Sequence, residues 1–270
     1  MRRKAFTLVE LLVVVAIIAL LISILAPSLK SAKDLAKQMI CATHLKSIGT
    51  GSTLYSEANR GEYPNHKWGA TRLNDGVPAP ANLCRAYAWN GDPTETPGLL
   101  PDGSGRNTPF GIGFLHFTGV VQPDMLYCPM QLQQTRWFRK CYPDPYSLKK
   151  LPYAEAGSNV FHAGYQYQPN VTLTSDNSTG YYTFVKAEQM PARAFLAMDI
   201  MMRSLDYAHL LAGEDKPMWQ VATGGGSVIQ KQSDKVYRLI DDLGGWYGGT
   251  NDPDAWKYHV QAMGYIQGAP

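Results

Sequence analysis

The sequence is poor in charge: only 17% of its 270 residues are Asp, Glu, Lys or Arg, against about a quarter in an average soluble domain. Arg2, Arg3 and Lys4 account for the whole net charge of +3, since the other 22 of the 25 basic residues balance the 22 acidic ones. No basic stripe or patch follows, which excludes a nucleic-acid-binding protein. Because 45% of the residues are hydrophobic, the low charge indicates a chain that buries a core rather than a disordered one.

The sequence also lacks the motifs of common catalytic and cofactor sites. It contains no H-E-x-x-H, no Walker loop, no G-x-S-x-G and no dinucleotide fingerprint. Its six histidines are scattered without the spacing of metal ligands. The sequence therefore predicts a protein that is not an enzyme and that needs no cofactor.

Cysteine is scarce, and no two of the four cysteines have C-x-x-C spacing, so the sequence does not support a zinc knuckle or a thioredoxin-type motif. Outside the cytoplasm, four cysteines allow three disulfide pairings. The working hypothesis is the pair that closes the shortest loop, Cys128 with Cys141. The sequence leaves the other pairings open; the four residues are Cys41, Cys84, Cys128 and Cys141.

Apolar residues are concentrated near the start of the chain. From Leu11 to Ala26 there is no charged residue, and Ser23 is the one polar residue. Residues 6–29 number about 24 and would span about 36 Å as a helix, enough to cross a hydrocarbon layer of ~30 Å. The run is apolar on all sides, which favours lipid or a helix bundle as its surroundings. We predict a single transmembrane helix over residues 6–29.

Signal peptides and a plain anchor are the alternatives for this segment. A secretory signal has an apolar core of about 7–15 residues followed by a small-residue cleavage site, and this core is too long. Arg2-Arg3 matches a twin-arginine signal only loosely. For a plain anchor, the basic residues before the run favour a cytoplasmic N-terminus, although the lysines that follow it weaken this signal. Those lysines are Lys30, Lys33 and Lys37.

A plain anchor leaves Glu10 and Pro27 unexplained. A carboxylate inside a bilayer is unfavourable and usually marks a partner. Proline removes one helical hydrogen bond and bends the helix. The alternative interpretation places Glu10 at the membrane interface and ends the span at Pro27.

The stretch Ala5-Phe6-Thr7-Leu8-Val9-Glu10-Leu11-Leu12-Val13-Val14 resembles the processing and methylation motif of type IV prepilins and type II secretion pseudopilins. The resemblance implies that a prepilin peptidase cuts between Ala5 and Phe6 on the cytoplasmic side and methylates the new amino group of Phe6. Residues 1–5 would then be a leader peptide. Glu10 would pair with the N-terminal amine of a neighbouring subunit, and Pro27 would bend the helix. Ala5 stands where the family usually carries Gly.

A seam of residues along one helix face predicts that the helix continues beyond the membrane. Residues at offsets 0, 4, 7, 11 and 14 lie on one face of a helix, and they are Cys41, Leu45, Ile48, Ser52 and Tyr55. We expect an amphipathic continuation over residues 30–60, with one helix from Phe6 to about Ala58 on the order of 80 Å long, stopped by Asn59-Arg60-Gly61. The alternative is a separate short helix after a break at Pro27.

The segment from Cys41 to Gly49 extends the likeness. It is similar to the C-x-x-N-L-K-x-I-G stretch of secretion-protein-G-like proteins, with His44 where that family has Asn. Leu126-Tyr127-Cys128-Pro129 resembles a strand-ending Cys-Pro step of the same relatives.

Residues 61–270 predict a periplasmic or extracellular head. Residues 61–129 are rich in Gly and Pro but interleaved with aromatic residues, which indicates an ordered, loop-rich insertion. Strand signals place a β-sheet region in 151–270. They lie at residues 164–168, 181–185 and 194–198, followed by a hairpin around Thr223–Gly226 and a short helix capped by Ser233. Together these features predict an α+β, pilin-like fold, a long N-terminal helix on a loop-rich antiparallel sheet.

Oxygen-bearing side chains gather on Gly-rich stretches near the C-terminal end. Such loops suit calcium, and some of the resembled pseudopilins hold calcium near this end. The alternative interpretation is a solvated turn. The residues are Asp241, Asp242, Asn251, Asp252 and Asp254.

The resemblance implies a structural subunit that waits in the inner membrane with its N-terminus in the cytoplasm and then enters a periplasmic or cell-surface filament. Its partners would be the prepilin peptidase and other pilin or pseudopilin subunits. Pilus and secretion pseudopilus both stay open. The alternative is a membrane-anchored binding protein with a pilin-like sorting head, whose aromatic residues could stack on carbohydrate.

Overall fold

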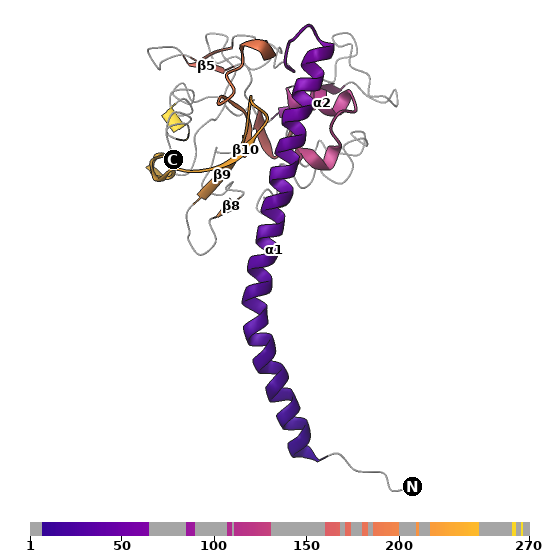
Figure 1. Ribbon diagram of the computed structural model, residues 1–270, viewed down its shortest axis with the longest axis vertical. Helices are drawn as coiled ribbons and strands as arrows, with labels where there is room; N and C mark the ends of the chain where they lie inside the picture. Colours follow the sequence, from indigo (N-terminus) through magenta and orange to yellow (C-terminus); the bar gives the residue numbers. More distant parts are fainter. Residues whose placement is uncertain are drawn as a thin grey trace. The chain divides into compact units, whose positions relative to one another are not determined.

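The computed structural model (Figure 1) describes residues 7–64, 85–89, 107–109, 111–130, 160–167, 171–173, 180–182, 186–199, 209–210, 217–242, 261, 262 and 266. Residues 1–39 and residues 40–270 form two compact units. The helix α1 (Leu8–Ala58) contributes to both, and every other described element belongs to the second unit.

Helix α1 is helical without interruption, including at Pro27. The alternative of a separate helix after a break at Pro27 is therefore wrong. Two hydroxyls near Pro27 donate to carbonyls of the helix, Ser28 Oγ to Leu25 O at 2.8 Å and Ser31 Oγ to Pro27 O at 3.2 Å. A bend at Pro27 stays a prediction.

The predicted stop signal ends α1. Asn59 Nδ2 donates to the carbonyl of Tyr55 at 2.7 Å, and Gly61 N–H donates to the carbonyl of Ser56 at 2.8 Å. Arg60 and Gly61 both have positive φ, 56° and 81°, which reverses the chain direction and is favourable for Gly. The carbonyls of Tyr55 and Ser56 in the last turn are thereby satisfied.

The main sheet of the second unit is antiparallel, with strand order β10-β9-β7-β4. It is formed by β4 (Tyr165–Tyr167), β7 (Phe195–Asp199), β9 (Pro217–Thr223) and β10 (Val228–Gln232), while β8 (His209–Leu210) also pairs with β9. The strands predicted at 164–168 and 194–198 are confirmed. The signal at 181–185 corresponds to β6 (Gly180–Tyr182), which pairs with β5 (Val171–Leu173) in a separate ribbon.

The predicted hairpin is also confirmed, since β9 and β10 pair in register from Ala222↔Val228 to Met218↔Gln232. Its glycine-rich tip packs back onto the turn before β7. Gly224 N–H donates to Ala194 O at 2.9 Å, and Gly225 N–H donates to Ala192 O at 2.8 Å. Lys46 of α1 donates to the carbonyl of Gly226.

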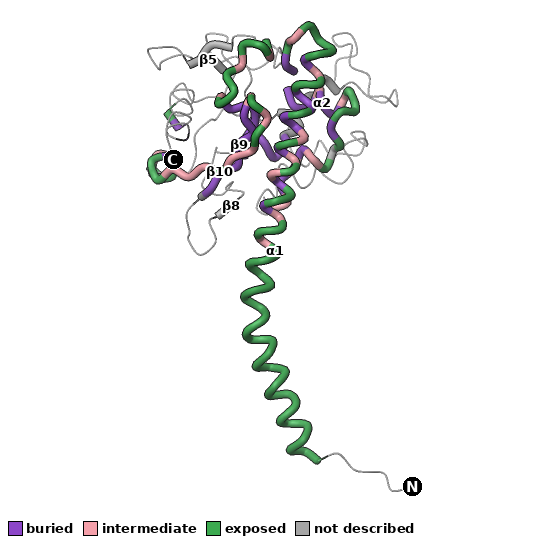
Figure 2. Tube along the Cα trace, in the orientation of Figure 1, coloured by how far each residue is buried: buried purple, intermediate pink, exposed green. Residues whose placement is uncertain are grey.

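One face of this sheet is covered by the second half of α1. Cys41, Leu45 and Ile48 of the predicted seam form a buried cluster with side chains of the sheet, which are Tyr165, Tyr167, Leu196, Ala197 and Ala222. A β-bulge between Phe195 and Ala197 lets the adjacent Leu196 and Ala197 both reach this cluster. The seam and the predicted α+β fold are confirmed (Figure 2).

A second buried cluster contains the opposite side chains of the same strands. Phe195, Met198, Trp219 and Val221 pack there with Val236 of α4 (Asp234–Asp242). Val236 N–H bonds to Ser233 Oγ at 3.4 Å, so the helix predicted after Ser233 is confirmed.

The described part of residues 61–129 contains short elements. They are β1 (Arg85–Trp89), β2 (Asn107–Pro109), α2 (Ile112–Phe117) and the 3-10 turn η2 (Pro123–Leu126); β1 pairs with β2 and with β3 (Val160–His162). A second 3-10 turn, η4 (Ala187–Gln189), precedes β7. Leu126–Pro129, which resembles a strand-ending Cys-Pro step, follows no strand here: Pro123 starts η2, and the N–H of Tyr127 bonds back to Asp124 O at 3.2 Å.

Candidate functional site

The first half of α1 exposes apolar side chains on every side. Each large apolar residue from Leu8 to Leu29 is at least 47% exposed, and Figure 2 shows this half of the helix as exposed throughout. Among the described residues, α1 is the one helix long and apolar enough to cross a membrane. Such a surface is unfavourable in water, so lipid or other apolar helices must cover it.

The carboxylate of Glu10 caps the start of α1. Its Oε2 accepts the backbone N–H and the hydroxyl of Thr7, both at 2.8 Å, and Glu10 N–H donates to Thr7 Oγ1 at 3.3 Å. This reciprocal arrangement is a capping box. Our sequence reasoning missed Thr7, although Thr7-Leu8-Val9-Glu10 carries the T-x-x-E pattern that signals it. Ala5 and Phe6 lie outside the described residues, so cleavage and the pairing of Glu10 with an amine stay predictions.

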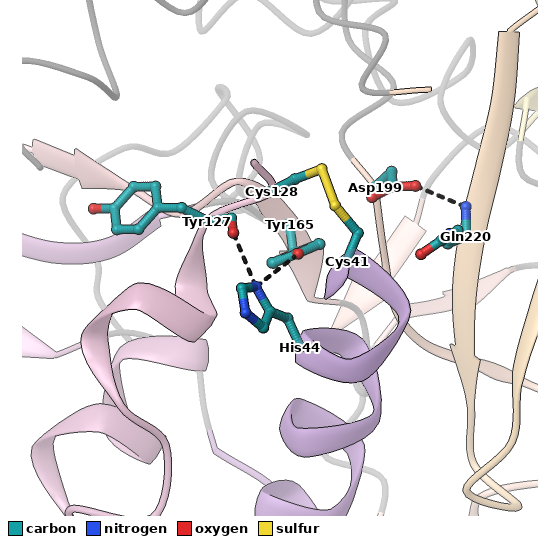
Figure 3. Close-up of a disulfide and its surroundings, with 7 residues drawn as sticks. All are labelled: Cys41, His44, Tyr127, Cys128, Tyr165, Asp199 and Gln220. Carbon is teal, nitrogen blue, oxygen red and sulfur yellow. Dashed lines mark hydrogen bonds between the residues drawn. A yellow bond between two sulfur atoms is a disulfide. The ribbon is translucent and has the colours of Figure 1, made fainter. Parts of the chain in front are cut away.

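A disulfide joins Cys41 of α1 to Cys128, which follows η2 (Figure 3). Their Cα atoms are 5.3 Å apart, within the range of disulfides, and both residues are buried. The working hypothesis of a Cys128–Cys141 bond is therefore wrong, because position in the fold and not loop length brings the sulfurs together. Cys84 and Cys141 lie outside the described residues.

His44 lies one turn of α1 beyond Cys41 and holds the same segment. Its Nδ1 is 3.0 Å from the carbonyl oxygen of Tyr127, and since a carbonyl can only accept, Nδ1 carries the proton. The hydroxyl of Tyr165 is 3.4 Å from the same nitrogen. Partial burial lowers the pKa of His44, while the carbonyl of Tyr127 and the charge of Asp124 oppose that shift. His44 is thus a donor that attaches residue 127 to α1.

Tyr165 lies between His44 and Asp199 in the buried cluster (Figure 3). Burial raises the pKa of Tyr165 well above its ordinary value, and the nearby Asp199 adds to the effect. The phenol is therefore neutral at pH 7. Together with the disulfide, these contacts attach the 123–128 segment and the sheet to one stretch of helix.

Asp199 bridges a gap in the strand pairing. The neighbours of β9 on this side are β7, from Thr223 to Val221, and β8, at Met218 and Pro217. Between them, the backbone N–H of Gln220 donates to Asp199 Oδ2 at 2.7 Å. The buried carboxylate thus serves as a ladder acceptor, which is a structural role.

The predicted calcium residues are only partly described. Asp241 and Asp242 lie in the last turn of α4, whereas Asn251, Asp252 and Asp254 lie outside the described residues. Within the described part of the chain, no group of three or more His, Cys, Asp or Glu residues could hold a metal ion. Calcium binding stays a prediction.

The long N-terminal helix packed on an antiparallel sheet is a pilin-like arrangement. Residues 1–26 match the family model described as "Prokaryotic N-terminal methylation motif". No curated protein and no solved structure matches the chain. The fold and the motif together define a protein similar to type IV pilins and pseudopilins, and the motif implies processing by a prepilin peptidase. The apolar helix is consistent with membrane anchoring before assembly.

Proposed function

We propose that this protein is a structural subunit of a type IV pilus or of a type II secretion pseudopilus. The observation that carries the proposal is the exposed apolar first half of α1, which belongs to a prepilin-type motif and contains a single carboxylate. The protein needs no catalytic residue or cofactor for this role, because assembly uses surface complementarity. Its partners are the prepilin peptidase and other pilin or pseudopilin subunits, in a filament of one or several kinds of chain.

The proposed course begins in the inner membrane, with the N-terminus in the cytoplasm. Prepilin peptidase removes residues 1–5 and methylates Phe6. Residues 6–29 hold the chain in the bilayer, residues 30–60 continue the helix, and residues 61–270 form the head in the periplasm. The subunit then leaves the bilayer and joins a periplasmic or cell-surface filament.

Glu10 supplies the register of this assembly. In the uncut chain Thr7 donates to the carboxylate. A charged carboxylate in an apolar layer is stabilised by a partner of opposite charge, and the new amine of Phe6 on a neighbouring subunit is such a partner. An alignment that leaves Glu10 without an amine is disfavoured, so one alignment of neighbours is selected. Pro27 would bend the helix beyond the Glu10 contact, near the end of the apolar run.

Mass spectrometry of the mature N-terminus tests processing. We expect a chain that begins with N-methyl-Phe6. An intact Met1, or a cut after Ala26, would contradict the proposal, since the first means no processing and the second means a secretory signal.

Substitution of Glu10 tests assembly separately from processing. Glu10→Ala should still yield a mature N-terminus at Phe6 but should form no filaments. Glu57→Ala is the control, because Glu57 is an exposed carboxylate of the same helix outside the apolar run. Unchanged function of Glu10→Ala would instead favour a membrane-anchored binding protein whose pilin-like head serves only for sorting.

A further inference from the structure

Three lysines lie on one side of α1, directly after its membrane-length run. Lys30, Lys33 and Lys37 fall within an arc of about 60° when successive residues are placed 100° apart, and we call them the lysine face. Lys30 and Lys33 are exposed and Lys37 is half-buried. Asp34 beside them is the one acidic residue in positions 11–56 of the chain. Over these positions α1 can therefore neutralise only one of the three lysine charges.

The position of the lysine face is opposite to the usual charge distribution of a membrane helix. A helix whose N-terminus lies in the cytoplasm usually carries its excess of basic residues on the cytoplasmic side. Arg2, Arg3 and Lys4 follow this rule, but in the proposed course they are removed with residues 1–5. The mature chain then keeps its lysines at the outer end of the membrane-length run, where α1 supplies a single counter-charge.

The lysine face lies at the height of the lipid headgroups. Residues 8–29 span about 33 Å as a helix, which fills a hydrocarbon layer of ~30 Å, and the headgroup layer on each side adds about 5–8 Å. The Cα atoms of Lys30 and Lys33 lie about 2 Å and about 6 Å beyond Leu29. Lys37 lies about 12 Å beyond it, but helical side chains lean toward the N-terminus, and the long lysine stem reaches back to the headgroups.

Phospholipid phosphates are the partner that fits these three charges. A lysine ammonium carries three donors and binds phosphate oxygens as a point charge, and basic residues next to a membrane attract anionic lipids. Lys30 and Lys37 are about 10 Å apart along the helix axis, so they can contact different headgroups of one leaflet. The α1 of another copy would offer Asp34 alone between positions 11 and 56, which leaves most of the lysine charge unpaired. An anionic membrane surface therefore matches the lysine face better than a neighbouring helix.

We propose that the lysine face binds anionic phospholipid headgroups in the periplasmic leaflet of the inner membrane. This inference rests on the proposed function, because it requires a helix that spans this membrane with its N-terminus in the cytoplasm. Removal of the leader takes away the basic residues on the inner side, so the lysine face becomes the main electrostatic contact of the mature subunit with the membrane. It holds the subunit at the outer surface until the subunit enters the filament.

Native mass spectrometry of the full chain tests the lipid contact. The protein is purified in detergent from its own cells and mixed with equal amounts of phosphatidylglycerol and phosphatidylcholine that have the same acyl chains. We expect about fivefold more bound phosphatidylglycerol than phosphatidylcholine, the effect of about one lysine at an anionic surface. The variant Lys30→Gln/Lys33→Gln/Lys37→Gln should bind the two lipids equally. The variant Lys30→Arg/Lys33→Arg/Lys37→Arg should keep the preference, because it keeps the charges.

The control Arg193→Gln/Lys235→Gln/Arg238→Gln removes three positive charges from exposed positions of the head and should keep the preference. Equal binding of both lipids by the wild type, a preference that survives in the glutamine variant of the lysine face, or its loss from the control would overturn the inference. Dimers of the wild type that bind no phosphatidylglycerol, and that the glutamine variant does not form, would overturn it in favour of acidic side chains on another copy.

The same spectra give the mass of the chain, which reports on the proposed function separately. A chain that begins with N-methyl-Phe6 but has no lipid preference overturns the lysine-face contact and leaves the proposed function in place. An uncut chain contradicts the proposed function whatever lipid it binds, and if it also has no lipid preference, both fail.

Discussion

Gly51 of α1 lies directly against Val121, so that a Cβ atom added to Gly51 would be 3.0 Å from Val121 Cγ2. Val120 Cγ1 would be 3.1 Å away. Val121 is buried, and valine has few rotamers into which it could retreat. The segment after α2 thus packs against the backbone of α1 because position 51 has no side chain.

This contact predicts opposite effects for two neighbouring glycines. Gly51→Ala should lower the free energy of unfolding by about 1–3 kcal/mol through overpacking. Gly49→Ala is the control, because its added Cβ would have ordinary contacts of 3.9 Å and 4.0 Å and should raise stability by about 0.5–1 kcal/mol through helix propensity. Denaturant unfolding of both variants measures the difference. Stabilisation by both substitutions would contradict the packing described.

Removal of the Cys41–Cys128 disulfide should destabilise the head. A cross-link that closes a loop with a sequence separation of 87 is worth about 4–5 kcal/mol in the chain-entropy account. The double variant Cys41→Ala/Cys128→Ala should unfold at a lower temperature, and a non-reducing digest of the wild type should contain the two cysteines in linked peptides. Peptides that link Cys128 to Cys141 would show that the pairing is wrong.

Acid should weaken the head through His44. Because burial makes its folded-state pKa lower than the unfolded value of about 6.5, the unfolded chain binds more protons in this range. The stabilisation by neutral His44 is complete above about pH 6.5 and is lost as the pH falls from there through the folded-state pKa. Burial also lowers the pKa of His116, which acts in the same direction.

His44→Asn tests this effect, since an amide can still donate to the Tyr127 carbonyl but does not titrate. The free energy of unfolding, measured between pH 7.5 and 5, should depend less steeply on pH in this variant. The slope from His116 should remain. An unchanged slope would remove His44 as a source of pH dependence.

The stability of the head should depend on the acceptor oxygen of Asp199 rather than on its negative charge. Asp199→Ala leaves the buried N–H of Gln220 without the bond described and should cost about 1–3 kcal/mol. Asp199→Asn keeps an acceptor oxygen and should cost less. Thermal unfolding compares the two, and equal losses would indicate that the charge itself matters.

Periodic features of the sequence predicted the fold well. The seam from Cys41 to Tyr55 and the β9–β10 hairpin follow from local spacing and turn chemistry, and both are present. Features that depend on contacts between distant residues were missed. The Cys41–Cys128 bond depends on residue 128 lying beside α1, and no local pattern indicates that position.

The sequence drew attention to Glu10 as an assembly residue, which stays a prediction, but not to Thr7, with which its carboxylate bonds. The T-x-x-E spacing of Thr7 and Glu10 is the local signal of a capping box, whereas the prepilin-type motif points to a partner on another chain. The close approach of Gly51 to Val121 could not be read from the sequence, because nothing local indicates which segment would reach that position.

The bond between Cys41 and Cys128 also determines how the head responds to mechanical load. A pull on the N-terminal half of α1 reaches the core of the head through a covalent bond at residue 41, so the chain between the two cysteines carries no tension. In single-molecule stretching of the oxidised protein, the segment between the two cysteines should not extend. Reduction of the disulfide should add roughly 300 Å to the measured contour length. If the subunit is drawn out of a membrane by its N-terminal helix, the disulfide keeps α1 covalently attached to the core of the head under tension.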